Sequence, residues 1–145
     1  MMDLRVVVFK GNQEAAFAHA AMIRETVFLD EQQFSRDFDE VDEYAWHAVV
    51  YEGDTPVATG RYFADEQGAH HIGRVAVQKI YRGKKVGAYL MQQLEELAAS
   101  QGAKEITVGA QIRASQFYGK QGYRSNQLTA QELPLQERYG KICLL

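Results

Sequence analysis

The most informative segment of the sequence is Arg82-Gly83-Lys84-Lys85-Val86-Gly87-Ala88. It follows an apolar, strand-like run at residues 72–77 and precedes a helix-like stretch at residues 86–101. A turn between a strand and a helix gathers several backbone N–H groups at the positive end of the helix dipole. Such an arrangement suits a phosphate or pyrophosphate group. The segment, called the glycine loop below (residues 82–88), therefore predicts an anion-binding site.

Length and composition indicate one domain over residues 1–145. The chain has 145 residues, of which 46% are hydrophobic and 24% are charged, so it can bury a full core without disulfides or structural metals. The single cysteine, Cys143, excludes an intramolecular disulfide, and no Cys/His spacing resembles a zinc site. No apolar run approaches the roughly 20 residues of a membrane span, and the N-terminus enters a strand rather than a signal peptide. We expect a cytoplasmic protein with no membrane contact and no metal.

Charges are segregated along the chain, whose net charge is -3. Residues 30–43 carry seven acids and one base, whereas residues 79–85 carry four bases and no acid. The acidic segment either draws in a cationic amine or is a solvated surface loop. The acidic balance of the whole chain argues against nucleic-acid binding.

The remaining sequence predicts an α/β fold, with a mixed sheet and helices on its faces. Apolar runs predict strands at residues 4–9, 44–52, 55–63, 70–78, 105–111 and 142–145. Apolar residues near the 3.6-residue period predict helices from Asn12, as N-cap, to about Leu29, at residues 86–101 and at residues 115–121. Turn-forming residues at 53–56 and 65–68 predict two hairpins.

Residues 82–87 resemble the Arg/Gln-x-x-Gly-x-Gly/Ala signature of the GNAT (Gcn5-related N-acetyltransferase) superfamily. Residues 111–123, with Ala114, Phe117-Tyr118 and Lys120-Gln121-Gly122-Tyr123, look like a later motif of that superfamily. Residues 24–32 and 46–48 are similar to its ElaA/YjcF-like branch. The similarity runs in the right order from about Ile23 to Tyr123.

This resemblance implies a GNAT-like acyl-CoA N-acyltransferase fold and transfer of the acetyl group of acetyl-CoA to a primary amine of a small molecule or protein. The strand backbone at residues 74–77 is expected to pair with the pantetheine arm, and the glycine-loop amides are expected to bind the pyrophosphate. Members of this superfamily are commonly dimers, so a homodimer is a further expectation. The residues expected to contact the cofactor are Val75, Ala76, Val77, Arg82, Gly83, Lys84, Lys85, Val86, Gly87, Ala88, Phe117, Tyr118 and Lys120.

Lys85 departs from the signature, because a glycine commonly stands at its position. A lysine is tolerated there if its φ/ψ are helical, whereas a positive φ would strain the loop. We expect the helical case, with the side chains of Lys84 and Lys85 reaching phosphate oxygens. A side chain placed at Gly87 is expected to face the phosphates.

Acyl transfer to an amine needs a polarised carbonyl, a neutral amine and a proton for the departing thiolate. A backbone N–H of Val75, Ala76 or Val77 could polarise the thioester oxygen. Tyr118 is the candidate acid, because a phenol is protonated at pH 7; the alternative is that Phe117 and Tyr118 are core aromatics.

The candidate bases are Glu25, Glu31 and His47, acting directly or through water. For His47 the alternative is an ordinary strand histidine, and for Glu25 it is a surface ion pair with Arg24, Arg61 or a lysine. His70 and His71 are adjacent in a strand and face opposite sides, so they do not form a metal pair.

Two other functions compete with the acetyltransferase. One is a non-catalytic CoA-binding sensor or interaction module with the same fold. The other is a nucleotide-binding enzyme, which is disfavoured because the glycine loop lacks both Gly-x-x-x-x-Gly-Lys-Ser/Thr and Gly-x-Gly-x-x-Gly.

Overall fold

The computed structural model of the chain describes residues 2–31, 38–111, 115–126 and 136–142. The elements in chain order are β1 (Leu4–Lys10), α1 (Phe17–Arg24), the π-helix η1 (Glu25–Glu31), the 3₁₀-helix η2 (Glu40–Glu43), β2 (Trp46–Glu52), β3 (Thr55–Ala64), β4 (His70–Val77), the 3₁₀-helix η3 (Lys79–Tyr81), α2 (Val86–Ser100), β5 (Glu105–Gln111), α3 (Ser115–Lys120), β6 (Arg124–Asn126) and β7 (Gln136–Ile142). None of the helices in these ranges is long and apolar enough to cross a membrane.

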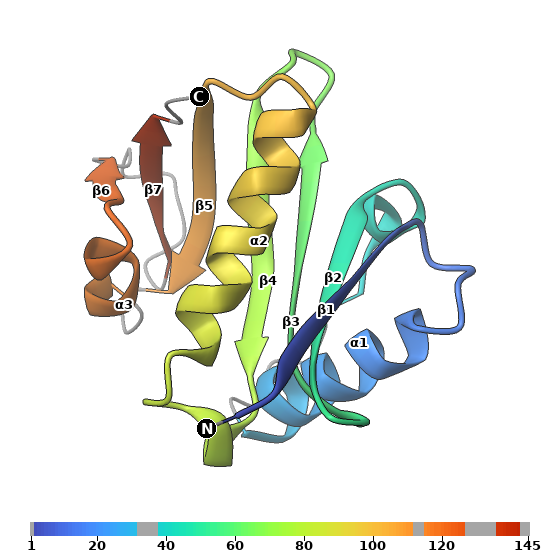
Figure 1. The fold of residues 1–145 in the computed structure, drawn as a ribbon. Coiled ribbons are helices and arrows are strands. Elements are labelled where there is room, and N and C mark those ends of the chain that lie inside the picture. The colour runs from blue at the N-terminus through green and yellow to red at the C-terminus, as the bar shows by residue number, and fades with distance from the viewer. Residues whose placement is uncertain (1, 32–37, 112–114, 127–135, 143–145) are drawn as a thin grey trace.

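The seven strands of the described ranges belong to one sheet of order β1-β2-β3-β4-β5-β7-β6 (Figure 1). Every neighbouring pair is antiparallel except β4 and β5, which are parallel and joined by α2. A parallel pair needs such a crossover, whereas antiparallel neighbours can be joined by tight turns. The predicted mixed sheet with flanking helices is therefore confirmed.

The two main helices cover opposite faces of the sheet. Ala48 and Val50 of β2 pack in the core cluster that contains α2 residues such as Leu90 and Leu94. Val49 and Tyr51, which alternate with them, pack in the cluster that contains Ala20 and Ile23 of α1. Both faces of the strands at the centre of the sheet are thus buried, which explains their almost continuously apolar sequence.

Most predicted elements agree with the structure to within one or two residues, but the first helix does not. Its regular part begins at Phe17 after Ala16, so Asn12 is not its N-cap. Gly11, at φ 82°, turns the chain back from β1, and its N–H donates to the Ala45 carbonyl, so the helix starts only after this turn. The helix then widens into the π-helix η1 from Glu25.

The C-terminal region also differs from the prediction. The last strand is β7 at residues 136–142, paired with β5 over its whole length, whereas residues 143–145 lie outside the described ranges. The sequence QERYGKI of β7 carries little apolar alternation, and β6 has only three residues. Neither strand gives the periodic signal on which strand prediction depends.

A bulge interrupts β4 at its centre. Ala76 pairs with Thr59 and Gly73 pairs with Arg61, so Arg74 and Val75 together oppose the single residue Gly60. Arg74 has φ 51°, in the left-handed region that a side chain rarely occupies. Such bulges bend a strand and change the direction of its backbone groups.

Candidate active site

The site begins where the parallel strands β4 and β5 stop pairing. Within the described residues their ladder consists of His71 with Thr107 and Ile72 with Val108. Both strands continue, β4 to Val77 and β5 to Gln111. The strands separate toward their carboxyl ends, and the N-terminal end of α2 lies at that same end of the sheet (Figure 1). Among the described residues, the β4 backbone after the bulge therefore presents an edge toward β5 without a partner strand there.

The glycine loop leads from this edge into α2. Gly83 has φ 74° and Lys85 has φ 66° and ψ 13°, both in the left-handed region. The expectation of helical φ/ψ at Lys85 is therefore wrong, and this lysine adopts the conformation that the glycine of the signature would adopt without strain. The next residue, Val86, begins α2, whose first-turn amides have no carbonyl one turn earlier to bind.

Arg82 behaves differently from the rest of the glycine loop. Its backbone N–H donates to the Lys79 carbonyl at 3.2 Å and completes the short helix η3. Its side-chain Nε donates to the Val77 carbonyl at 2.9 Å, which ties the loop to the end of β4. The Arg82 amide and the Nε of its guanidinium are thus engaged within the fold, although the residue as a whole is exposed.

Gly87 brings α3 against the start of α2. A Cβ atom at this position would lie 2.8 Å from Cε1 and 3.0 Å from Cζ of Phe117, and 3.6 Å from Cγ2 of Val77. A side chain at Gly87 would therefore meet the Phe117 ring, rather than face the phosphates as expected from the sequence. This close approach places the predicted cofactor residues of β4, α2 and α3 side by side.

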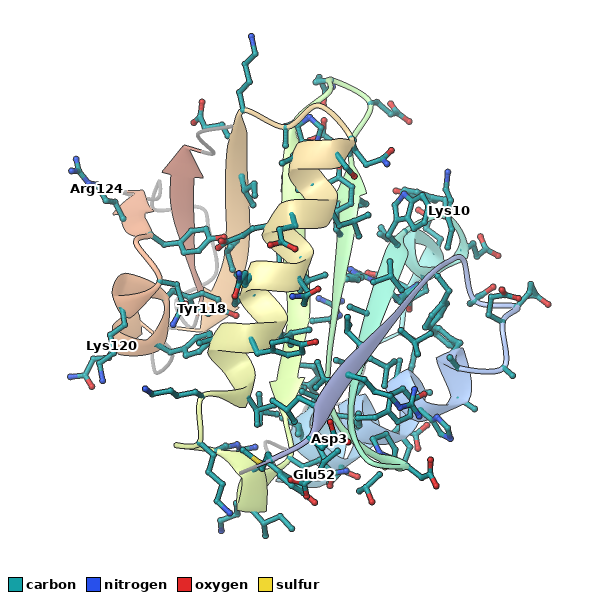
Figure 2. All side chains as sticks on the ribbon, in the orientation of Figure 1. Asp3, Lys10, Glu52, Tyr118, Lys120 and Arg124 are labelled. Carbon is teal, nitrogen blue, oxygen red and sulfur yellow. The ribbon has the colours of Figure 1, made fainter. Side chains whose placement is uncertain are left out.

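Tyr118 and Lys120 lie on α3, beside the half of the sheet formed by β5, β7 and β6 (Figure 2). The Tyr118 side chain is only 4% exposed, and its ring packs edge-on against Phe117 and Tyr123. The ring therefore belongs to the core, as the alternative interpretation predicted, while it also lies next to the predicted site. Lys120 is exposed.

His47 does not fit the role of a general base. Its side chain is 1% exposed, stacks on Phe9 with centroids 5.4 Å apart, and meets Phe17 edge-on. Its Nε2 donates to the Asp42 carbonyl at 3.1 Å. Burial lowers the pKa of His47, an effect that the Asp42 carbonyl and carboxylate oppose. The His47 ring is enclosed by protein and cannot reach the amine of an acetyl acceptor, so we do not retain His47 as the general base.

The two glutamate candidates lie on η1. Glu25 is exposed at the first residue of this π-helix, and the side chain of Glu31 lies outside the described set. Val27 and Phe28 of η1 pack in the same cluster as Ala76 of β4. Glu25 therefore stands on the element that covers the far side of the bulged strand.

His70 and His71 point to different partners, as the strand alternation predicts. His70 Nδ1 is 2.6 Å from the Tyr62 hydroxyl, and His71 Nε2 is 2.8 Å from Asp65 Oδ2. Across the described ranges, no group of three or more His, Cys, Asp or Glu side chains is arranged to hold a metal ion.

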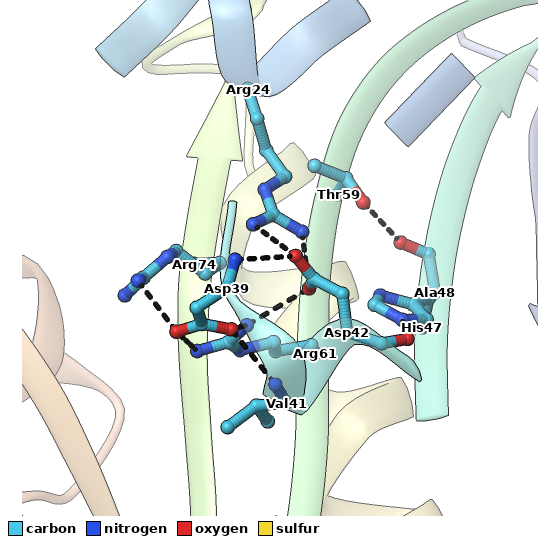
Figure 3. A network of polar contacts seen from close by, with 9 residues as sticks. All are labelled: Arg24, Asp39, Val41, Asp42, His47, Ala48, Thr59, Arg61 and Arg74. Carbon is cyan, nitrogen blue, oxygen red and sulfur yellow. Dashed lines mark hydrogen bonds and ion pairs between the residues drawn. The ribbon is translucent and has the colours of Figure 1, made fainter. Parts of the chain in front are cut away.

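A partly buried network of charges, which the sequence did not reveal, lies on the α1 face of the sheet beside the bulge (Figure 3). Asp42 of η2 accepts from Arg24 of α1 at 2.8 and 3.1 Å and from Arg61 of β3 at 2.9 Å. Asp39 accepts from Arg61 at 2.7 and 3.1 Å and from Arg74 at 3.2 Å. The network links α1, η2, β3 and the β4 bulge.

The electrostatics of this network keep its carboxylates charged. Burial alone would raise the pKa of Asp42, but the hydrogen bonds and charges of Arg24 and Arg61 outweigh burial and hold that pKa below its ordinary value. Partial burial likewise opposes, without overcoming, the lowering of the Asp39 pKa by Arg61 and Arg74. In the described part of the chain, Arg61 Nε is buried without a hydrogen-bond partner.

The same network corrects both interpretations of the acidic segment as far as Asp39 and Asp42 are concerned. Their carboxylates are paired with arginines, so they neither act as free charges for a cationic amine nor form a purely solvated loop. Asp39 also caps η2, because its Oδ1 accepts from the Val41 N–H at 3.1 Å. The spacing Asp-x-x-Asp of a capping box was the available sequence signal.

A mixed sheet whose parallel strands separate beside a glycine-bearing helix N-terminus is the architecture of an acyltransferase of the acyl-CoA N-acyltransferase fold. The model of the Acetyltransferase (GNAT) domain matches residues 11–132. The chain therefore belongs to the GNAT family of N-acetyltransferases.

Individual relatives agree with this assignment. The uncharacterized N-acetyltransferase YjcF of Bacillus subtilis is 35% identical over 123 residues, which cover 83% of this chain and 86% of YjcF. The crystal structure of ElaA from Escherichia coli superposes with a TM-score of 0.82 at 24% identity, over 96% of this chain and 99% of ElaA. An acyl-CoA N-acyltransferase from Pseudomonas aeruginosa gives a TM-score of 0.82 at 20% identity, over 96% and 99% of the two chains. The predicted ElaA/YjcF-like branch is confirmed.

Proposed function

We propose that this protein transfers the acetyl group of acetyl-CoA to a primary amine of a small molecule or a peptide. The observation that carries the proposal is the end of the β4–β5 ladder at Ile72 and Val108, directly before the glycine loop and the N-terminus of α2. An extended thioester arm can continue the sheet along β4 there, while its diphosphate meets the helix N-terminus.

The diphosphate contacts come from the backbone of residues 83–88 and from nearby cations. The amides of Val86, Gly87 and Ala88 open α2 and point toward its N-terminal end. The exposed side chains of Lys84 and Lys85 supply charge-assisted hydrogen bonds to phosphate oxygens. The remaining expected contacts, Phe117 and Lys120, come from α3, which packs against Gly87.

The thioester lies along β4 in this proposal. The extra residue at the bulge redirects the backbone N–H groups that follow, and one of those at Val75, Ala76 or Val77 polarises the thioester oxygen. A single donor of this kind is typically worth about 3 kcal/mol of transition-state stabilisation.

Two proton transfers complete the reaction. The amine nitrogen attacks the thioester carbonyl, the carbon–sulfur bond breaks, and the thiolate takes a proton from the Tyr118 hydroxyl. The amine gives up its own proton to Glu25, directly or through water, because Glu25 is exposed on the helix that covers β4.

The test is a panel of primary amines and short peptides incubated with acetyl-CoA, with released CoA measured by a thiol reagent. We expect release above the hydrolytic background for at least one acceptor, together with a mass increase of that acceptor by one acetyl group. Binding of acetyl-CoA without release for any acceptor would favour the sensor instead, and absence of binding would contradict both.

Tyr118→Phe tests the acid. Because the ring packing against Phe117 and Tyr123 is preserved, we expect the affinity for acetyl-CoA, measured by calorimetry, to stay within about threefold. We expect kcat with a good acceptor to fall by about 10²–10⁴-fold, the usual contribution of a general acid. An unchanged kcat would remove Tyr118 from the mechanism.

A further inference from the structure

We infer that Asp39 is a positioning residue for acyl transfer, which fixes the bulged backbone of β4 through its ion pair with Arg74. The inference rests on the proposed function, because it concerns the backbone amides to which that function assigns the thioester oxygen. It assigns a role to a carboxylate of the acidic segment that the proposed reaction itself does not use.

The carboxylate of Asp39, the N-cap of η2, joins two neighbouring strands at the bulge. Asp39 Oδ1 and Oδ2 accept from Arg61 Nη1 and Nη2 of β3 at 2.7 and 3.1 Å, which is a two-point contact. Asp39 Oδ2 also accepts from Arg74 Nη2 at 3.2 Å. Arg61 pairs with Gly73 in the ladder, and Arg74 is the next residue along β4. Asp39 thus holds both strands at the point where their register shifts.

Asp39 is itself held in place by the rest of the network. Arg61 Nη1, which donates to Asp39, also donates to Asp42 Oδ1 at 2.9 Å, and Asp42 is bound by Arg24 of α1. The backbone N–H of Asp39 donates to Asp42 Oδ2 at 3.3 Å, which completes the capping box at the start of η2. Figure 3 shows these side chains converging on Asp39 and Asp42 from separate elements. A carboxylate anchored in this way can hold the side chain of Arg74 in one position.

The position of Arg74 matters because of its backbone. Its φ of 51° is unfavourable for a residue with a side chain, so the surrounding contacts must maintain it. Val75 follows directly, and a rotation at Arg74 changes the direction in which the amides of Val75 and Ala76 point. Donors to a developing oxyanion act only when they are already aligned, and misplacement by about 1 Å can cost about 10²-fold in rate. Release of the tether should therefore lower turnover without removing any group that touches the substrate.

The experiment compares Asp39→Asn with Glu40→Gln. Asparagine keeps the N-cap acceptor for the Val41 N–H but loses the charge and the two-point contact with Arg61. Glu40 is the neighbouring exposed acid, so Glu40→Gln makes the same change of net charge in the same turn. We expect Asp39→Asn to lower kcat by about 10-fold or more, with acetyl-CoA affinity by calorimetry within about threefold, and Glu40→Gln to match the wild type.

Hydrogen exchange gives a readout that is independent of activity. With acetyl-CoA bound, we expect the peptide spanning residues 73–78 to exchange faster in Asp39→Asn than in Glu40→Gln. Equal exchange in the two variants, or equal kcat, would overturn the inference. A kcat loss that disappears when the assay temperature is lowered, in step with recovery of folded protein, would also overturn it, because the role would then be stability alone.

Arg74→Gly provides a second test, because glycine adopts the positive φ freely while the tether is removed. If Asp39 acts through Arg74, kcat of the double variant should equal that of Asp39→Asn within about twofold. Multiplicative losses would show that the two residues act separately. If none of the acceptors tested makes the wild type release CoA, the proposed function fails and this inference fails with it. If the wild type is active and Asp39→Asn has the same kcat as Glu40→Gln, the inference alone fails.

Discussion

Lys85 combines an unfavourable backbone conformation with a positive charge beside the proposed diphosphate site. Its φ of 66° is in the left-handed region, which costs a residue with a side chain about 1–2 kcal/mol. The ammonium group of Lys85 can offset this conformational free energy only when an anion is bound. The backbone conformation of Lys85 therefore lowers the stability of the fold, while its side chain favours ligand binding.

For Lys85→Gly we expect opposite effects on these two properties. The free energy of unfolding in urea should rise by about 0.5–1 kcal/mol, because glycine removes the strain but increases the entropy of the unfolded chain. Calorimetry should show weaker acetyl-CoA binding, by several-fold. Lys84→Gly removes the same charge next to it at a position without positive φ, so it should weaken binding without a gain in stability. A stability gain for Lys84→Gly equal to that for Lys85→Gly would contradict this explanation.

His47 should make the protein sensitive to mild acid. Its folded-state pKa is lowered by burial, so between that pKa and the unfolded value near 6.5 the unfolded chain binds more protons. Stability from this group is therefore complete above pH 6.5 and is lost as pH falls below it, with a slope of at most about 1.4 kcal/mol per pH unit.

The measurement is urea unfolding between pH 8 and pH 5 for the wild type and His47→Gln. Glutamine can still donate to the Asp42 carbonyl but does not titrate. We expect the wild-type free energy of unfolding to fall more steeply below pH 6.5 than that of the variant. Parallel curves would show that His47 does not titrate on unfolding.

At the scale of elements, Gly87 determines how closely α3 approaches α2. The methyl group of Gly87→Ala would meet the Phe117 ring at 2.8 Å, a distance that requires the ring to move. Since Phe117 is an expected cofactor contact, we expect acetyl-CoA affinity to fall by about 10-fold, measured by calorimetry. Gly119→Ala adds the same methyl group in α3 where nothing lies within 4 Å, and it should bind like the wild type. Equal affinities for both variants would mean that the Phe117 ring can move without weakening acetyl-CoA binding.

The elements also show what a sequence can and cannot predict. Strands β2 to β5 and helix α2 carried strong apolar periods and turn residues, and they were placed nearly correctly. The positive φ of Lys85 was missed although the glycine that commonly stands at this position of the signature was a signal for it, because the lysine itself favours helical angles. The ion pairs of Arg24 and Arg61 with Asp42 were missed because the partners are 18 and 19 residues apart in the chain. The Gly87–Phe117 contact was likewise not predicted, since it is created only when α3 docks.

At the scale of the whole molecule, the β4–β5 ladder is short, so a ligand such as acetyl-CoA that binds beside it is expected to stabilise the folded state. The ladder joins the β1–β4 half of the sheet to the β5–β7 half through two residue pairs, with α2 packed across it. A ligand lying along β4 would add hydrogen bonds where this ladder ends. At 100 times Kd, any ligand specific for the folded state adds about 2.7 kcal/mol to the free energy of unfolding.

We therefore expect saturating acetyl-CoA to raise Tm by about 5–10 °C in a thermal unfolding experiment. S-acetyl-N-acetylcysteamine has the thioester without the diphosphate, and it should leave Tm unchanged at the same concentration. A similar shift with both compounds would show that the glycine loop does not provide the affinity.

The bulge at Arg74 has one more consequence, for the length of β4. Ile72, Val75 and Val77 pack with the α2 cluster while Ala76 packs with the α1 cluster, although an uninterrupted strand would send residues 72 and 75 to opposite faces. If the bulge were straightened with both of its residues kept, Val75 and Val77 would turn toward α1 and Ala76 toward α2. Deletion of one bulge residue would instead leave a regular strand in which residues 72 and 75 stand two positions apart and keep their common face. Insertion of a residue into the regular part of β4 would turn the residues after it to the opposite faces. The count of residues at the bulge therefore sets which side chains of β4 meet each helix.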